Sequence, residues 1–352
     1  MKTAPTSCPS FSTGPELLPI DSGKQVGPGW TFADHLGAIG VRLNIRRMRY
    51  CVAPGLVAFG VPGPESPVFV SANYKLSFDL LRRALAGMNA WILVLDTNGI
   101  NVWCAAAKGT FGTAELVHRI RTCRLGKRVT HRRLILPQLS APGIVAHKVK
   151  EQTGFTVVYG PIYAADIPAF VQAGFQATPN MRRIRFGWRD RLGLVPLELV
   201  SGFRRMLLVG LILAVLTGFS SQGFSLTEAW EQGGLAFSLW MLSCVIACML
   251  GPLLLPVLPT RAFSIKGAGL GLVLASCGVV VATPDWSVGR TVAWFLIVSV
   301  GASHWLLVFT GATPFTSPSG VRREVRLALP AQIVIAGLGL FAWTGAGFLP
   351  RW

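Results

Sequence analysis

Five apolar stretches in the C-terminal part of the chain constrain its fold more than any other feature of the sequence. They lie near residues 206–222, 235–258, 264–283, 290–312 and 328–348. Each is close to the ~20 residues that a helix needs to cross the hydrocarbon core of a bilayer. The chain is 51% hydrophobic, with a mean hydropathy of +0.52, which is too apolar for a purely soluble protein. We therefore expect an all-α membrane domain of five transmembrane helices over residues 206–352.

Charged residues in the loops predict how these helices are oriented. Basic residues flank alternate ends of the stretches: Arg204, Arg205, Arg261, Lys266, Arg322, Arg323 and Arg326. The opposite loops carry Glu228, Glu231, Asp285 and a single basic residue, Arg290. Because cytoplasmic loops are enriched in lysine and arginine, we expect a multi-pass protein of the inner (cytoplasmic) membrane. Its soluble domain would then lie in the cytoplasm and its C-terminus outside.

Within the predicted spans, His304 is the one ionisable residue away from the ends. A transporter usually places carboxylates or cations inside its membrane helices. His304 could line a path through the membrane, but a packing role explains it more simply. Glycines such as Gly267, Gly269, Gly271 and Gly278 suit close helix packing. We therefore expect the membrane domain to serve as an anchor and assembly platform.

The positive charge of the chain is concentrated before the first predicted span. Residues 1–205 carry 26 Lys and Arg against 11 Asp and Glu, whereas residues 206–352 carry 7 against 4. A basic domain can bind nucleic acid, but positive charge beside the cytoplasmic leaflet explains this pattern more economically. We therefore expect the lipid bilayer, and no nucleic acid, as a partner. Residues 187–205 are predicted to be a basic juxtamembrane linker that contacts anionic headgroups.

The region before this linker divides into a tail and one α/β domain. Residues 1–40 are predicted to be a disordered N-terminal tail, because residues 1–30 are rich in Pro, Gly, Ser and Thr and lack a signal-peptide core. From residue 41 to residue 186, strand-like and helix-like stretches alternate, which predicts a Rossmann-like parallel sheet with crossover helices. We expect strands at 68–70, 91–95, 134–136 and 155–159, and helices at 76–88, 113–123, 142–152 and 164–173.

Small and polar residues follow the predicted strands, at the edge where open α/β sheets place their ligand crevices. They are Ser71-Ala72-Asn73, Asp96-Thr97-Asn98, Gln138-Leu139-Ser140 and Gly160-Pro161. Such a row suits a large ligand with a polar rim, although each residue taken singly is also an ordinary turn residue. Asn73, Gln138 and Gly160 are therefore candidate cofactor-binding residues.

A cysteine with three small neighbours follows the strand at 91–95. The segment reads Asn101-Val102-Trp103-Cys104-Ala105-Ala106-Ala107-Lys108-Gly109-Thr110. Alanine has the smallest side chain among good helix formers, so a flat ligand could lie against this helix and reach the sulfur. A buried cysteine that packs as a small hydrophobic residue is the open alternative.

The eight residues from Asn101 to Lys108 resemble the cap-helix signature of the mercury-methylating corrinoid protein family (HgcA), an N-[VI]-W-C-A-[AG]-[AG]-K pattern. The resemblance covers residues 46–186, and the membrane helices agree with the family in kind. Further similar segments are Gly109-Thr110-Phe111-Gly112-Thr113, Tyr74-Lys75-Leu76-Ser77-Phe78-Asp79, Leu136-Pro137-Gln138-Leu139, Gly160-Pro161 and Ala164-Ala165-Asp166-Ile167-Pro168.

This resemblance implies a corrinoid (cobalamin) cofactor whose cobalt takes Cys104 as its lower axial ligand, with the residues from Asn101 to Thr110 around it. It implies a methyltransferase that passes a methyl group from methyl-cobalamin to inorganic Hg(II), forming methylmercury. It also implies a methylfolate-linked methyl donor and a small ferredoxin-like protein with [4Fe-4S] clusters that returns cobalt to Co(I).

The other potential metal ligands of the sequence agree with this expectation. Many corrinoid domains ligate cobalt through the histidine of a D-x-H-x-x-G motif, and no such motif contains His35, His118, His131 or His147. Cys104 is then the remaining soft donor beside the alanines. The seven cysteines contain no C-x-x-C pair, so we expect no Fe–S cluster in this chain.

Two other classes of function stay open. A membrane-anchored enzyme with Cys104 as nucleophile would need a nearby base. His118 is too distant if the helix of Cys104 continues, whereas Lys108, one turn away, could stabilise the thiolate. A non-catalytic membrane receptor or transporter subunit would need neither a cofactor nor a base.

Overall fold

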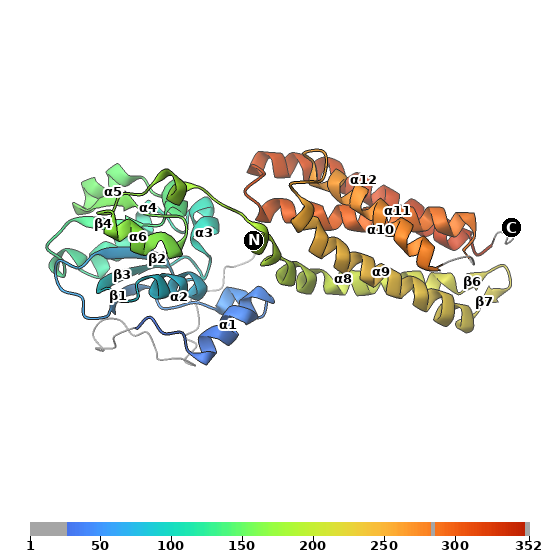
Figure 1. Cartoon of the computed structure of the whole chain (residues 1–352), viewed down its shortest axis with the longest axis horizontal. Coiled ribbons are helices and arrows are strands. Elements are labelled where there is room, and N and C mark those ends of the chain that lie inside the picture. The colour runs from blue at the N-terminus through green and yellow to red at the C-terminus, as the bar shows by residue number, and fades with distance from the viewer. Residues whose placement is uncertain (1–26, 283–285, 349–352) are drawn as a thin grey trace. The chain divides into compact units, whose positions relative to one another are not determined.

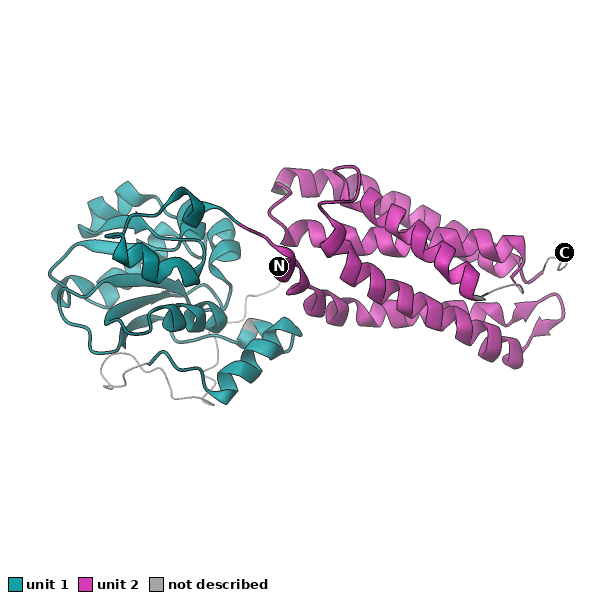
Figure 2. Ribbon diagram, viewed as in Figure 1, with its two compact units in different colours: residues 1–184 teal, residues 185–352 magenta. Residues whose placement is uncertain are grey.

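A five-stranded sheet lies at the centre of residues 1–184, the first of two units in the computed structural model; the second is residues 185–352 (Figure 2). The structure describes residues 27–282 and 286–348. The strands are β1 Gly55–Phe59, β2 Val68–Ala72, β3 Ala90–Leu95, β4 Arg133–Leu136 and β5 Thr156–Tyr159. Their order across the sheet is β1-β3-β2-β4-β5 (Figure 1).

The sheet is mixed, so the prediction of a parallel sheet holds for four strands and is wrong for the fifth. β2 to β5 pair in parallel, whereas β1 pairs antiparallel with β3. The connection from β1 to β2, residues 60–67, is rich in glycine and proline and too short for a crossover helix. Because the chain must therefore return from the same edge of the sheet, β1 runs opposite to β2.

Helices cover both faces of this sheet, which explains why β3 is buried along its whole length. On one face, α2 and α6 pack against Phe69, Ile92 and Ile135. On the other, α4 and α5 pack against alternate strand residues such as Val70 and Leu93. The helices of this unit are α1 Phe32–Arg42, α2 Lys75–Ala84, α3 Val102–Lys108, α4 Thr113–Thr122, α5 Ala146–Thr153 and α6 Ile167–Gln172. Its 3₁₀ segments are η2 Arg47–Arg49, η3 Leu125–Lys127, η4 Gln138–Gly143, η5 Ala164–Asp166 and η6 Pro179–Arg182.

Three predicted helices differ from the observed ones in their bounds. The helix expected at 76–88 ends at Ala84, before Gly87, whose φ of +78° is incompatible with a continuing helix. The helix expected at 142–152 begins at Ala146, because Pro142 belongs to η4. The helix expected at 164–173 divides into η5 and α6.

The strand order contains a topological switch point between β2 and β4. From β2 the chain passes through α2, on one face of the sheet, to β3, which is a neighbour of β2. It then passes through α4, on the opposite face, to β4, which is the other neighbour of β2. The crossover helices therefore leave these two neighbouring strands in opposite directions. Open α/β sheets bind their ligands at the carboxyl ends of strands at such a point.

Helix α1 corrects the prediction that residues 1–40 form a disordered tail. The helix begins after Thr31, whose side chain accepts a hydrogen bond from the backbone of Asp34, while the Asp34 carboxylate accepts one from the backbone of Thr31. This reciprocal pair is a capping box, which stabilises a helix start. Residues 1–26, with Cys8, lie outside the described residues.

The second unit contains five helices long and apolar enough to cross a membrane, in agreement with the prediction. They cover Trp188–Thr217, Leu226–Leu254, Phe263–Val281, Val288–Ala312 and Ser319–Gly345. The elements are α7 Trp188–Leu192, α8 Val195–Thr217, α9 Leu226–Leu254, α10 Phe263–Ala282, α11 Val288–Phe309, η7 Thr310–Ala312 and α12 Pro318–Gly345, with short strands β6 Phe219–Ser220 and β7 Gly223–Phe224. The region is therefore not purely helical, and α8 begins inside the segment predicted to be a linker.

Contacts between the candidate membrane helices give three of the four glycines a packing role, whereas His304 lines a cavity of about 310 Å³. An added Cβ at Gly271 would lie 2.5 Å from the Cα of Ser299, and one at Gly278 would lie 2.8 Å from the indole nitrogen of Trp294. Gly267 is equally close to the backbone of α11, whereas Gly269 has no such neighbour. His304 lies 3.2 Å from an Arg205 nitrogen and 3.4 Å from the Gln332 oxygen, so it links α8, α11 and α12.

Candidate functional site

The loop between β3 and α3 is held by the buried side chain of Asn73, at the end of β2. Its oxygen accepts hydrogen bonds from the backbone N–H of Thr97 (3.1 Å), the Thr97 hydroxyl (2.7 Å) and the backbone N–H of Gly99 (3.0 Å). Its amide nitrogen donates to a carboxylate oxygen of Asp96 (3.1 Å). With 1% exposure, Asn73 is fully engaged within the protein. The structure therefore places this predicted cofactor-binding residue where it positions the start of α3.

Helix α3 is short because it is capped closely at both ends. The side-chain oxygen of Asn101 accepts a hydrogen bond from the backbone N–H of Cys104 at 2.9 Å. Asn is a preferred N-cap residue because it satisfies an otherwise unpaired helical donor. At the other end Gly109 has a φ of +82°, the left-handed conformation that terminates a helix. These two caps fix the seven residues from Val102 to Lys108.

Two of the three alanines pack inward rather than offering a surface to a ligand. Ala105 and Ala106 are 0% and 5% exposed, whereas Ala107 is exposed. An added Cβ at Gly143 would lie 3.2 Å from the Cα of Ala106, so α3 and η4 are in near backbone contact. The alanines therefore let α3 lie directly on η4, which corrects the expectation that all three provide room for a ligand.

The opposite face of α3 presents Cys104 to the outside. Cys104, Ala107 and Lys108 are exposed, and Trp103 is 41% exposed. This exposure contradicts the alternative of a buried packing cysteine. By contrast, Cys123 is half-buried, and burial raises the pKa of its thiol. Of the free cysteines described in the first unit, Cys104 is thus the accessible one.

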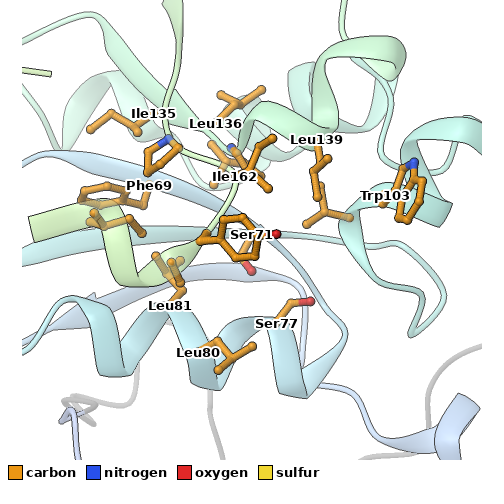
Figure 3. A pocket seen from close by; sticks show the side chains of 18 of the residues that line it. Phe69, Ser71, Ser77, Leu80, Leu81, Trp103, Ile135, Leu136, Leu139 and Ile162 are labelled. Atoms are coloured by element: carbon orange, nitrogen blue, oxygen red, sulfur yellow. The ribbon is translucent and has the colours of Figure 1, made fainter. Parts of the chain in front are cut away.

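A cleft of about 330 Å³ lies at the switch point between β2 and β4. Figure 3 shows Ser71, Leu136 and Ile162 at its centre, with α2 on one side and Trp103 of α3 at one end. The lining of the cleft is mostly apolar, and its polar side chains include Ser71, Ser77 and Asn101. It is lined by residues 69–71, 77, 80, 81, 101–103, 135–137, 139, 160–164 and 167.

The cleft brings together four of the predicted site residues: Asn101, Val102, Trp103 and Gly160. The side-chain oxygen of Gln138 is buried beside it, between the lining residues Pro137 and Leu139, and has no hydrogen-bond partner among the described residues. Gly109 and Thr110 lie after the helix, where the Thr110 hydroxyl donates to the Ala105 carbonyl at 3.4 Å. Cys104, Ala107 and Lys108 lie on the exposed face of α3.

The sequence did not indicate the walls of the cleft that come from α2 and from the segment before α6. Ser77, Leu80 and Leu81 belong to α2, and Tyr163 and Ile167 follow β5. Their positions depend on which face of the sheet each crossover helix covers. The hydrophobic periodicity of a helix does not indicate which face this is. Ser77 and Ile167 had been noted only as parts of similar segments.

The expectation that His118 is too distant to act as a base for Cys104 assumes one continuous helix, and the helix does not continue. Helix α3 ends at Lys108, and His118 is an exposed residue of the separate helix α4, with the Thr122 hydroxyl 3.4 Å from its ring. Across residues 27–282 and 286–348, no group of three or more His, Cys, Asp or Glu is placed to hold a metal ion. A corrinoid would not require such a group, because its ring supplies four of the metal's ligands and the protein adds at most one donor.

Comparison with known proteins shows what the region that contains this site is similar to. Residues 46–171 match the family described as CdhD, CO dehydrogenase/acetyl-CoA synthase delta subunit. The chain is 32% identical over 123 residues to the acetyl-CoA decarbonylase/synthase complex subunit gamma of Archaeoglobus fulgidus, covering 34% of this chain and 26% of that protein. It is 28% identical over 116 residues to the corrinoid/iron-sulfur protein large subunit of Moorella thermoacetica, covering 32% of this chain and 26% of that protein.

These similarities support a corrinoid-protein-like domain within the first unit. The chain spans about a quarter of the length of the curated relatives that it matches. The matched residues include α3 and all five strands of the sheet. The five candidate membrane spans lie outside the matched region.

Proposed function

We propose that this chain is a membrane-anchored corrinoid protein that transfers a methyl group to inorganic Hg(II), forming methylmercury. The observation that carries the proposal is the exposed thiol of Cys104, on a capped helix beside the cleft at the switch point. Similarity to a corrinoid/iron-sulfur protein supports the cofactor. The eight-residue segment from Asn101 to Lys108, which resembles the signature of mercury-methylating proteins, supports the acceptor.

The residues present at the site fit a corrinoid. Cys104 offers one accessible soft donor, and the exposed Ala107 on the same face adds little bulk. The unpartnered oxygen of Gln138 can accept a hydrogen bond from an amide at the rim of the ring. Gly160 lines the cleft at the end of β5, where an added Cβ would contact the side chains of Ile135 and Phe170. When bound, the corrinoid supplies a methyl group carried on cobalt.

Each of these residues has a distinct task in the proposed reaction. Cys104 would hold the metal of the bound cofactor through its sulfur and would supply electron density to it, and such a protein donor is a main means by which a protein tunes a cofactor. Asn101 and Asn73 fix α3, and so they fix the position of the sulfur. Trp103 and the apolar lining of the cleft exclude water from the ligand.

The proposal includes protein partners and a membrane location. The related proteins are named as subunits of the acetyl-CoA decarbonylase/synthase complex or of a corrinoid/iron-sulfur protein. For this chain we propose a methylfolate-linked methyl donor and a separate ferredoxin-like protein with [4Fe-4S] clusters as the reductant. The five helices anchor the chain in the inner membrane, with the corrinoid domain in the cytoplasm and the C-terminus outside.

Reconstitution of the full chain tests this function. The purified protein is loaded with a corrinoid, supplied with a methyl donor, a low-potential reductant and Hg(II), and assayed for methylmercury by mass spectrometry. We expect a cobalt absorption spectrum and methylmercury formation that requires the corrinoid. A loaded protein that forms no methylmercury contradicts the proposed acceptor, and a protein that retains no corrinoid contradicts the proposed cofactor.

A further inference from the structure

Helix α1 carries large apolar side chains on the face that points away from its own domain. Phe32, Leu36 and Ile39 are 78%, 52% and 53% exposed. Their spacing of four and three residues places them on one side of the helix. Ala38 and Val41, each 2% exposed, lie on the opposite side against the domain. We call Phe32, Leu36 and Ile39 the outer stripe of α1.

The orientation of this stripe is fixed by the inner face of the helix. The Asp34 carboxylate pairs with Lys75 and Arg82 of α2, and the backbone oxygen of Asp34 accepts a hydrogen bond from the Tyr50 hydroxyl at 3.4 Å. An added Cβ at Gly37 would collide with the ring of Tyr50. Helix α1 therefore packs closely on the domain, and it cannot turn its outer stripe inward without breaking these contacts.

A basic segment follows the outer stripe directly. Arg42 ends α1, and Arg46, Arg47 and Arg49 come within the next seven positions, next to Ile45, which is 57% exposed. The sequence contains no Asp or Glu between His35 and Pro64. An apolar helical stripe beside an arginine cluster is the composition of helices that lie in a membrane interface.

We propose that α1 lies in the plane of the bilayer surface, with its outer stripe at the boundary of headgroups and acyl chains and its arginines on anionic lipid phosphates. The positive charge favours an anionic lipid surface as the occupant of this stripe. The five candidate membrane helices of the same chain keep α1 near the bilayer, which gives the lipid surface a high effective concentration around the outer stripe. A stripe of three apolar side chains is therefore large enough for α1 to bind the bilayer. This second attachment restricts how the first unit can move over the membrane.

Photo-crosslinking of the full chain in lipid nanodiscs tests the proposal. A benzophenone side chain is introduced singly at Phe32 or at Leu36, and at Ala33 as a control, because Ala33 is exposed on the flank of the same helix. All three positions face outward, so the label leaves the packing of α1 intact. After irradiation, mass spectrometry separates lipid adducts from adducts with protein.

In discs that contain anionic phosphatidylglycerol, we expect lipid adducts at Phe32 and Leu36 several-fold above those at Ala33. The excess should fall in discs of phosphatidylcholine alone, and also in an Arg42→Glu, Arg49→Glu double variant. Equal lipid labelling at all three positions would overturn the proposal. Adducts that join the outer stripe to a protein segment would also overturn it and would identify a protein partner instead.

Discussion

Helices α1 and α3 are both short elements at the surface of the first unit, but they are held in place in opposite ways. Helix α1 is fixed by charge: Asp34 and Asp79 pair with Lys75 and Arg82 in a closed group of four side chains. Helix α3 is fixed mainly by amides: those of Asn73, which also donates to the Asp96 carboxylate, and of Asn101, together with the close contact of Ala106 with Gly143. The difference shows that the helix of Cys104 is held mainly by amide hydrogen bonds, and that none of the ion pairs found among the described residues includes a residue of α3. Variants that remove one kind of support should affect one helix and leave the other unchanged.

Asn73→Leu should have the largest effect on α3. The substitution leaves the buried N–H groups of Thr97 and Gly99 unpaired, and each unpaired buried donor costs about 1–3 kcal/mol. We expect faster hydrogen exchange over residues 96–108 and weaker corrinoid retention, with little change in α1. Mass-spectrometric hydrogen exchange on the full chain measures both helices together. Unchanged exchange in the loop before α3 would contradict the role assigned to Asn73.

Asp34→Ala should have the next largest effect, on α1. Removing one partner from a buried ion pair costs about 3–5 kcal/mol, and we expect the lower end because Asp79 still pairs with Lys75 and Arg82. The exchange protection of residues 32–42 should fall while that of α3 persists. Glu151→Ala serves as a control, because Glu151 is an exposed residue of α5, which packs on the other face of the sheet. Equal loss of protection in α3 would show that the two helices are not held independently.

Acid, like Asp34→Ala, should destabilise α1 more than α3. Burial acts to raise the pKa of Asp34, but hydrogen bonds from Lys75 and Thr31 and the charge of Lys75 outweigh burial and lower that pKa to about 2. Because the folded pKa is lower than the ordinary value of 3.8, this carboxylate stabilises the fold above pH ~4. The stabilisation is lost as the pH falls from about 4 to about 2. In that window we expect pulse-labelled hydrogen exchange to show that α1 opens before α3.

Asn101→Ala should have the smallest of these effects. It removes the N-cap of α3, which is typically worth ~1 kcal/mol. Asn101→Asp is the matched control, because aspartate offers the same acceptor to the Cys104 N–H. Corrinoid affinity should fall for the alanine variant and stay near the original value for the aspartate variant. If both variants lose affinity equally, Asn101 acts through a direct contact in the cleft and not through the cap.

The sheet could be predicted from the sequence because β2, β3 and β4 are buried on both faces and therefore read as continuous apolar runs. Strand β1 was not predicted, although it has an apolar run, Leu56-Val57-Ala58-Phe59; this run is short and lies between proline- and glycine-rich segments. Helix α1 was missed because the composition around it is typical of a tail. The capping pair Thr31 and Asp34 was the available signal.

The candidate site was predictable in its motif but not in its geometry. The strand-to-helix position of Cys104 followed from the apolar run of β3 and the helical spacing after Thr113. The inward packing of Ala105 and Ala106 depends on η4, which lies more than thirty residues later in the chain, so the motif alone cannot indicate it. The role of Asn73 likewise depends on a loop that follows another strand.

The central claim, that Cys104 is the single protein donor to the cofactor, is tested most directly by its substitution with Ala, Thr and His. Because Cys104 is exposed, packing alone predicts that all three changes are mild. A ligand role predicts that Cys104→Ala and Cys104→Thr lose corrinoid-bound cobalt and methylmercury formation, whereas Cys104→His keeps cobalt but methylates less.

The decisive measurement is the cobalt absorption spectrum of the loaded full chain, recorded for the original protein, the three variants and Cys123→Ala as a control. We predict altered spectra for all three Cys104 variants and an unchanged spectrum for Cys123→Ala. A Cys104→Ala protein with the original spectrum and full methylation activity would contradict the account.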